Sequence, residues 1–275
     1  MNKSLPAILL LVLAAAGSIP ALAQEAVPDV DEIVQRANHV AYYQGKDGRA
    51  QVEMVITDNQ GRERQRNFTI LRRDSSDSEA TENRAYLGEQ QFYVYFQRPA
   101  DVNKMVFLVH KKLEADDDRW LYLPALDLVK RIAASDKRTS FVGSDYFYED
   151  VSGRSIDADQ HELLRTTDNY YVLRHTPKDP ASVEFAYYDM FVHKQTFVPV
   201  QIEFFAAGGE KYRVARALKV DTVQGFPTVL EASMENLKTG SKSVMRYSQV
   251  NYDLDIPAEV FTERFMRMPP RDYLR

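Results

Sequence analysis

The chain has 275 residues, of which 44% are hydrophobic, and a formal net charge of −5. Proteins that bind nucleic acid through its phosphates need a basic surface, so this charge argues against nucleic acid as a partner. The chain contains no cysteine, which excludes disulfide bonds, thiolate metal sites, a cysteine nucleophile and acylation of an N-terminal cysteine.

The first 23 residues have the pattern of a secretory signal peptide. Lys3 supplies a positive start, a short apolar run follows, and Ala-Leu-Ala at 21–23 matches a cleavage site. The apolar run is shorter than the ~20 residues of a membrane-spanning helix. We therefore expect cleavage after residue 23 and a mature chain, 24–275, that forms one soluble domain without a membrane anchor. The expected location is the periplasm of a Gram-negative bacterium.

An amphipathic helix is predicted near the start of the mature chain. Apolar residues recur there at a spacing of three and four: Val30, Ile33, Val34, Ala37 and Val40. Asp29 is a suitable N-cap, and Gly45 is expected to end the helix. Such a helix typically covers one face of a sheet.

From Arg49 onward the pattern becomes one of strands. Val52, Met54 and Ile56 alternate with polar residues, and a turn at 58–61 leads into a second run. Further strand-like runs cover 91–97, 104–112, 119–124, 128–133, 161–167, 170–176, 183–194, 197–205, 210–221, 228–236 and 242–252. This gives about a dozen strands with short connections, as in a curved antiparallel sheet or barrel. A polar stretch at 72–83 is predicted to be a mobile loop, and 256–265 a short terminal helix.

Aromatic residues are concentrated in these strands. Small barrels fill their interior with side chains, whereas wider or half-open ones hold a ligand. Each aromatic residue taken singly fits a core position, but one sheet with two helices leaves a large apolar surface to cover. A bound apolar ligand is one candidate for that cover.

Catalytic and metal-binding signatures are weak. The run that begins at His161 resembles a zinc-protease helix, but Arg165 stands where the second histidine ligand is needed. The other histidines, His39, His110, His175 and His193, have no neighbour at a metal-ligand spacing, so we expect neither a metal nor a cofactor. Asp145, Glu149 and Asp150 are candidates for paired carboxylates of a hydrolase or for a calcium site.

Residues 107–150 carry a resemblance to a known family. The blocks "FLVHKK", "DDDRWLYLPAL" and "VKRIAASDKRTSFVGSDYFYED" resemble the signature of the LolA-like, outer-membrane lipoprotein-sorting protein family of periplasmic carriers. The order of elements and the ending "NYDLDIPAEVF" agree with it. The resemblance implies a mainly β (α+β) fold: a half-open, highly curved antiparallel β-barrel with an N-terminal helix and short lid helices. It also implies an apolar cavity that holds acyl chains.

The resemblance suggests which residues form the site. It implies that the segment 140–150 is a lid or rim, in which Phe141, Tyr146, Phe147 and Tyr148 face the cavity or the sheet. The cavity candidates are Phe107, Val109, Trp120, Tyr122, Phe141, Phe147 and Phe204. The candidates for ion pairs, a turn or partner docking at the lid are Lys130, Arg131, Asp136, Lys137, Arg138, Gly143, Asp145, Glu149 and Asp150. A structural crossover held by the same ion pairs is the alternative.

The sequence thus predicts a monomeric periplasmic carrier for a lipid, lipoprotein or other hydrophobic cargo. An inner-membrane exporter would donate the cargo and an outer-membrane acceptor would receive it. Two alternatives stay open. One is an adaptor without a cavity that docks on an exporter of the resistance-nodulation-division (RND) type, and the other is a hydrolase that uses the three carboxylates.

Overall fold

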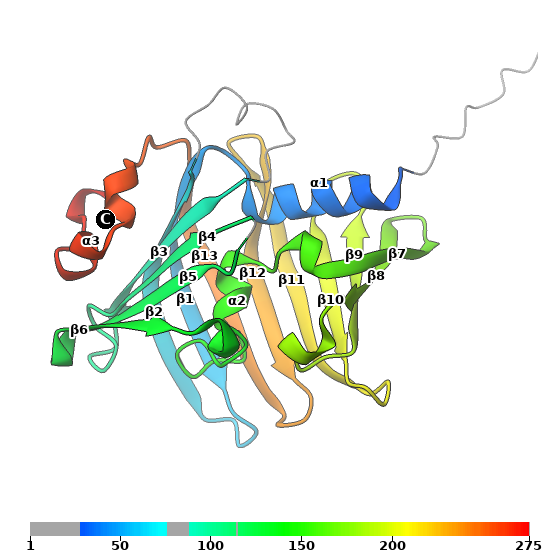
Figure 1. The fold of residues 1–275 in the computed structure, drawn as a ribbon, viewed down its shortest axis with the longest axis horizontal. Helices are drawn as coiled ribbons and strands as arrows, with labels where there is room; N and C mark the ends of the chain where they lie inside the picture. The colour runs from blue at the N-terminus through cyan, green and yellow to red at the C-terminus, as the bar shows by residue number, and fades with distance from the viewer. Residues whose placement is uncertain (1–27, 76–87, 114, 275) are drawn as a thin grey trace, which may run out of the picture.

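The computed structural model describes residues 28–75, 88–113 and 115–274 (Figure 1). The predicted signal peptide and most of the predicted loop at 72–83 lie outside these residues. Helix α1 covers Val30–Tyr42, and the carboxylate of Asp29 accepts a hydrogen bond from the backbone N–H of Val30, as expected of an N-cap. The helix ends three residues before the predicted stop at Gly45.

The described residues form a single sheet of thirteen strands, with the order β6-β5-β4-β3-β2-β1-β13-β12-β11-β10-β9-β8-β7. Every neighbouring pair is antiparallel. The strands are β1 (Asp47–Thr57), β2 (Glu63–Asp74), β3 (Gln90–Arg98), β4 (Val106–Lys111), β5 (Asp118–Leu123), β6 (Leu128–Ile132), β7 (Asp159–Thr166), β8 (Tyr170–Pro177), β9 (Tyr187–His193), β10 (Pro199–Phe205), β11 (Lys211–Val223), β12 (Phe226–Asn236) and β13 (Ser241–Tyr252).

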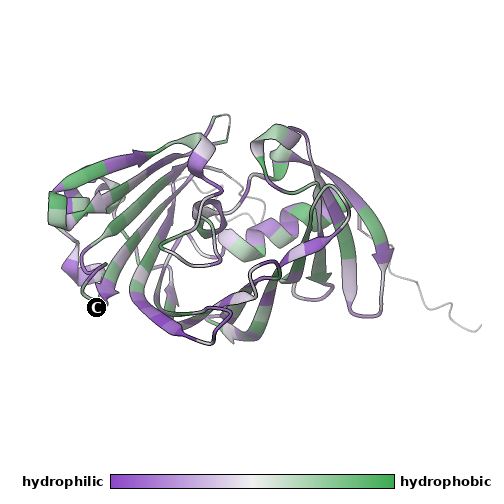
Figure 2. Ribbon diagram, turned by 90° about the horizontal axis from the view of Figure 1, so that it is seen from below, coloured by the Kyte–Doolittle hydropathy of each residue, from purple (hydrophilic) through white to green (hydrophobic). Residues whose placement is uncertain are grey.

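The sheet is curved but not closed, because β6 and β7 are its two free edges. Seen from below, the strands form an arc with α1 in its hollow (Figure 2). This confirms the predicted mainly β, half-open and highly curved antiparallel fold.

Residues 133–158 connect the two edge strands and are called the crossover segment below. The segment contains the short helix α2 (Tyr148–Ser152) and runs in front of the sheet on the side of α1 (Figure 1). We call this side the concave face. The crossover segment carries the signature run that begins at Asp136, so the chain places that run against the middle of the sheet.

The two faces of the sheet are covered by different parts of the chain. On the concave face, Ile33, Val34 and Ala37 of α1 pack against Leu173 of β8 and Val192 of β9. On the convex face, the C-terminal segment with α3 (Glu263–Arg267) packs over β2, β3 and β4. On the concave face near β1 and β13, α1 and the crossover segment leave a hollow unfilled.

Candidate ligand-binding cavity

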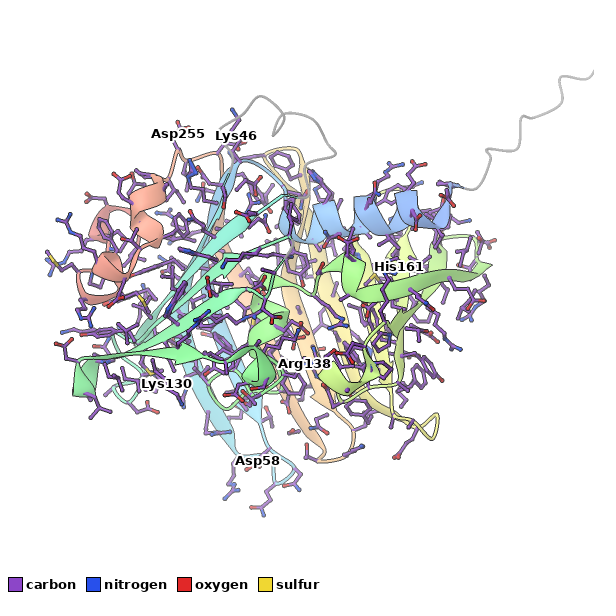
Figure 3. The ribbon with its side chains drawn as sticks, viewed as in Figure 1. Lys46, Asp58, Lys130, Arg138, His161 and Asp255 are labelled. Atoms are coloured by element: carbon purple, nitrogen blue, oxygen red, sulfur yellow. The ribbon has the colours of Figure 1, made fainter. Side chains whose placement is uncertain are left out.

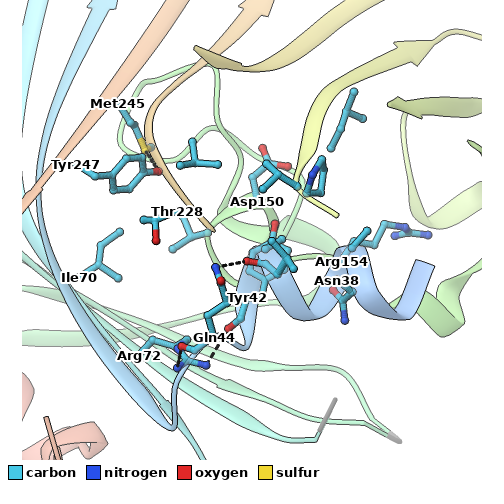
Figure 4. A pocket seen from close by; sticks show the side chains of 18 of the residues that line it. Asn38, Tyr42, Gln44, Ile70, Arg72, Asp150, Arg154, Thr228, Met245 and Tyr247 are labelled. Atoms are coloured by element: carbon cyan, nitrogen blue, oxygen red, sulfur yellow. Dashed lines mark hydrogen bonds between the residues drawn. The ribbon is translucent and has the colours of Figure 1, made fainter. Parts of the chain in front are cut away.

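A cavity of about 440 Å³ lies between α1, the crossover segment and the concave face of the sheet. This volume lies in the range of natural small-ligand sites, ~300–1,000 Å³. Figure 4 shows Ile70, Thr228 and Tyr247 from the strands on one side, with Tyr42 and Asn38 of α1 opposite.

Most of the cavity wall is apolar. It includes Phe68, Ile70, Phe92, Phe141, Ile202 and Met245. Phe68 and Phe141 pack edge to face, with ring centroids 6.2 Å apart, so the aromatic wall is continuous from β2 to the crossover segment. Such a surface favours contact with an apolar ligand over contact with water.

Arg72 fixes the α1 side of the cavity. Its guanidinium donates to the backbone carbonyls of Tyr42, Gln44 and Gly45 at 2.9, 2.8 and 2.6 Å, and it pairs with Asp74 at 2.9 Å. The carbonyl of Tyr42 belongs to the last turn of α1, where helical carbonyls lack intrahelical donors, and the other two follow the helix. The buried Arg72 therefore anchors the end of α1 to β2.

The crossover segment is held to the centre of the sheet by Asp145. Its carboxylate accepts hydrogen bonds from the hydroxyls of Ser241 and Ser243 on β13, the second at 2.7 Å. Arg213 of β11 donates to the backbone carbonyl of Asp145 at 2.9 Å and forms an ion pair with Asp150. The segment is thus attached to two central strands.

A second group of charges joins parts of the same segment to one another and to Glu184. Glu149 is buried and lies 3.5 Å from Lys137, 3.1 Å from Arg138 and 3.6 Å from Arg154. Arg138 also pairs with Glu184 at 2.6 Å, which helps to keep the pKa of that carboxyl below its usual value despite its burial. The guanidinium of Arg138 lies in front of the middle of the sheet (Figure 3).

Of the seven predicted cavity residues, the structure places two in the wall. Phe141 and Phe204 line the cavity. Phe107 and Val109 are fully buried in the core behind Phe141, with the rings of Phe107 and Phe141 5.6 Å apart. The guanidinium of Arg213 lies over the ring of Phe147, 4.0 Å from the ring centroid. Ligand contact by Phe141 and Phe204 stays a prediction.

Trp120 and Tyr122 lie on the convex face, which differs from the predicted placement. Paired residues of neighbouring strands share a face, and Trp120 is paired with Leu108. The prediction had placed Trp120 on the same face as Phe107, which is paired with Leu121 and faces the concave side. Both side chains pack against the cluster that contains the C-terminal segment. Alternation within one strand does not reveal which face is concave, because only the pairing register does.

The remaining predicted residues are spread along the segment from β6 to α2. Lys130 is exposed on the β6 edge (Figure 3), and Arg131 pairs there with Asp118. Asp136 accepts the N–H of Thr139 through its backbone carbonyl. Gly143 has a φ of +81°, and its carbonyl accepts a hydrogen bond from Arg64 at 3.1 Å. The structure therefore separates Lys130 and Arg131 from the buried charges of the crossover segment.

The three candidate catalytic carboxylates each have hydrogen-bond or ion-pair partners within the protein. Asp145 is bound by serines, Glu149 by Lys137 and two arginines, and Asp150 by Arg213 and the backbone N–H of Phe147. Ion-pair and hydrogen-bond partners of this kind suit a structural role. Across the described residues, no group of three His, Asp or Glu side chains could hold a metal ion.

Sequence reasoning missed a histidine pair. His161 of β7 and His175 of β8 are paired in register, and their Nδ1 atoms lie 2.8 Å apart. No local pattern reveals this pair. Next to the turn the register pairs Thr166 with Tyr171, and only the register shift between Leu163 and Arg165 brings His161 opposite His175. His175 lines the cavity, and His161 lies below α1 (Figure 3).

Comparisons with known proteins agree with this architecture. A family model described as that of an "uncharacterized protein" matches residues 88–268. No curated protein matches the chain. None of the helices in the described ranges combines the length and apolarity needed to span a bilayer.

Three solved structures share the fold. A DUF1329 family protein from Desulfovibrio piger has a TM-score of 0.75 and 24% identity, over 87% of this chain and 100% of that one. A putative outer membrane lipoprotein-sorting protein domain from Vibrio parahaemolyticus has a TM-score of 0.75 and 23% identity, over 86% and 97%. A LolA superfamily protein from Nitrosomonas europaea has a TM-score of 0.64 and 21% identity, over 87% and 100%.

Proposed function

We propose that this chain, which belongs to the family whose model matches residues 88–268, is a periplasmic carrier of a lipid or other hydrophobic cargo. The resemblance of residues 107–150 to the LolA-like, outer-membrane lipoprotein-sorting group and the fold shared with two such proteins support the proposal. The cargo would occupy the cavity between α1, the crossover segment and the sheet during its passage towards the outer membrane. The observation that supports this proposal most directly is the largely apolar cavity of about 440 Å³.

The driving force for such a carrier is the transfer of hydrocarbon out of water. Each buried methylene contributes ~0.8 kcal/mol, so a chain of several methylenes binds without any covalent step. Release then requires an acceptor that binds the cargo more favourably, or a partner that stabilises an open form. An inner-membrane donor and an outer-membrane acceptor are the partners that this proposal implies.

The two alternatives have less support. An adaptor that docks on an exporter with a self-filled sheet needs no cavity, whereas this sheet leaves one beside α1. A hydrolase needs carboxylates whose oxygens are free to act on a substrate. Asp150 lines the cavity, but it and Glu149 are each bound by arginine side chains. The carrier is therefore the function that the geometry supports best.

Native mass spectrometry tests the proposal. The protein is purified from the periplasm under mild conditions, and spectra are recorded before and after extraction with organic solvent. We expect an adduct of lipid size that extraction removes and that returns when a lipid extract of the host is added. A protein that carries no adduct and takes up no added lipid would contradict the proposal.

A further inference from the structure

The cavity has room for about one hydrocarbon chain. Its volume is about 440 Å³. In another protein, an apolar cavity of ~150 Å³ binds benzene, which allows ~25 Å³ for each carbon atom. At the same packing this cavity holds ~18 carbon atoms, the size of one long acyl chain. A diacyl lipid has a second chain of similar size, and the cavity has no space for it.

Packed side chains stand behind the walls of the cavity on both sides. On the side of β2 and β3, Phe68, Phe92 and Phe141 belong to the main hydrophobic core of the sheet. On the side of β9 and β10, Tyr188 and Phe204 belong to a second cluster, with ring centroids 5.4 Å apart. Protein cores are packed about as densely as organic crystals, so neither cluster offers further space for hydrocarbon.

The two covers of the cavity, α1 and the crossover segment, are fixed to the sheet and touch each other. Arg72 of β2 binds the carbonyl of Tyr42 at the end of α1, at 2.9 Å. Arg213 of β11 forms the ion pair with Asp150 of α2. A Cβ added to Gly153 would lie 2.7 Å from the ring of Tyr42, so the covers leave no space between them at this point. A wider cavity would require these buried contacts to break.

The charged side chains of the wall have partners within the protein. Arg154 lines the cavity and pairs with Asp159 at 2.9 Å, and Arg138 lines it and pairs with Glu184 at 2.6 Å. A charged group of a ligand inside the cavity would compete with these pairs or stay unpaired, and burial of an unpaired charge is costly. The part of a cargo that enters the cavity is therefore uncharged hydrocarbon.

Ala41 marks the opening of the cavity. It is exposed, whereas the other residues that line the cavity are buried or half-buried. Val34, Asn38 and Ala41 follow one another at a spacing of four and three, which places them on one face of α1, the face that lines the cavity. An exposed residue on this face shows that solvent reaches the cavity beside it.

We propose that the cargo is a single-chain amphiphile. One hydrocarbon chain of up to ~18 carbon atoms lies in the cavity, and the polar group at its end stays outside, beside Ala41. A diacyl lipid is a poor cargo, because its second chain would remain in water and a carrier has to shield all the hydrocarbon that it moves. This inference rests on the proposed carrier function and names the chemical class of its cargo.

Two lipids that differ in the number of chains test the proposal. Palmitoyl lysophosphatidylcholine and dipalmitoyl phosphatidylcholine share a head group and an acyl chain, but only the second lipid is diacyl. Delipidated protein is incubated with equal amounts of both, supplied as cyclodextrin complexes, and native mass spectrometry identifies the adducts. We expect one monoacyl molecule per protein. The diacyl adduct should be at least about tenfold weaker, the effect of leaving as few as two methylenes in water.

Chain length provides an independent measurement. Lysophosphatidylcholines of increasing length should bind about fourfold more tightly for each added methylene. The gain should stop near ~18 carbon atoms, where the cavity is full. Val229→Trp places an indole in the cavity and should move this limit to chains shorter by about two or more carbon atoms. Leu218→Trp, at an exposed position outside the cavity, should leave the limit unchanged.

The outcomes separate this inference from the carrier itself. Equal uptake of the two lipids, or an affinity that keeps rising for chains well beyond this length, would overturn the single-chain cargo but not the carrier. Uptake of neither lipid would overturn the carrier as well. The comparison of the two lipids uses the wild-type protein, so it decides the question even if Val229→Trp does not fold.

Discussion

Arg213 of β11 and Asp150 of α2 form an ion pair that joins the crossover segment to the centre of the sheet. Arg213 is 1% exposed, and its guanidinium also packs on the ring of Phe147 at 4.0 Å. Asp150 additionally accepts the backbone N–H of Phe147 at 2.7 Å. One carboxylate thus fixes both the start of α2 and the position of α2 over the sheet.

Replacement of Asp150 by Asn should destabilise the fold. The change leaves the charge of the buried Arg213 without its partner, and loss of one member of a buried pair costs about 3 kcal/mol of unfolding free energy. Arg246→Met is a control, because Arg246 is 52% exposed and its ion pairs with Glu53 and Glu231 should each contribute less than about 1 kcal/mol. Urea denaturation measures both. Equal losses in the two variants would show that the Arg213–Asp150 pair has no special role.

Gly153 should not tolerate alanine. It follows α2 with a φ of +80° and a ψ of 149°, and an added Cβ would lie 2.7 Å from the ring of Tyr42 in α1. Strain at this backbone conformation and the clash should each cost about 1–3 kcal/mol. Gly209→Ala is the control, since Gly209 has a φ of +78° but open space around its Cβ position. Thermal unfolding should show a clearly larger loss for Gly153→Ala, and similar losses would contradict the role of the contact.

Local patterns predicted much of this fold. The spacing of Val30, Ile33, Val34 and Ala37, with Asp29 before them, was sufficient for α1, because an amphipathic face and a cap are local properties. The alternating runs predicted the strands for the same reason. The half-open shape needed the family resemblance, since alternation does not say whether a sheet closes.

The site was harder to predict because it depends on register and on distant contacts. The convex position of Trp120 follows from its pairing with Leu108, which no pattern within β5 reveals. The anchoring of α1 by Arg72 joins residues about 30 positions apart through backbone carbonyls, which every sequence has. Phe141 was predicted to face the cavity or the sheet, and its side chain both lines the cavity and packs into the core cluster of the sheet.

Asp74 should make the protein less stable as the pH rises through the acidic range. Burial raises its pKa from 3.8 to about 6, although Arg72 and Gln90 act in the opposite direction. Between these values the folded protein binds more protons than the unfolded chain, so the contribution of Asp74 falls with rising pH. Relative to Asp74→Asn, the wild-type unfolding free energy should decline by about 1.4 kcal/mol per pH unit in this window and level off above it. A difference that stays constant from pH 3.8 to about 6 would contradict this assignment.

His175 should produce the opposite slope. Its pKa falls from 6.5 to about 3 in the folded protein, mainly because burial disfavours the imidazolium and also because His161 lies beside it. Here the unfolded chain binds more protons, so the contribution of His175 is complete above its unfolded pKa and is lost as the pH falls. Relative to His175→Phe, the wild-type protein should gain stability as the pH rises towards 6.5. Urea titrations at several pH values measure the slope, and a decline in this range would contradict a buried neutral histidine.

A bulky residue at Val229 should block the cavity. Val229 is a half-buried residue of β12 that lines the cavity, and Val229→Trp would place an indole in the space for cargo. Loss of room for two methylenes, at ~0.8 kcal/mol each, should weaken binding of an apolar fluorescent probe by about tenfold or more. The variant should keep its secondary structure, because its side chain has open space in the cavity.

Leu218→Trp is the matched control for this experiment. Leu218 lies on the adjacent strand β11, is 46% exposed and does not line the cavity. The same large side chain at that position should leave probe affinity within about twofold of wild type, because substitutions at exposed sites rarely change stability by more than ±0.5 kcal/mol. If both tryptophans weakened binding equally, the loss caused by Val229→Trp would not be specific to the cavity. If neither did, the cavity between α1 and the crossover segment would not be where apolar molecules bind.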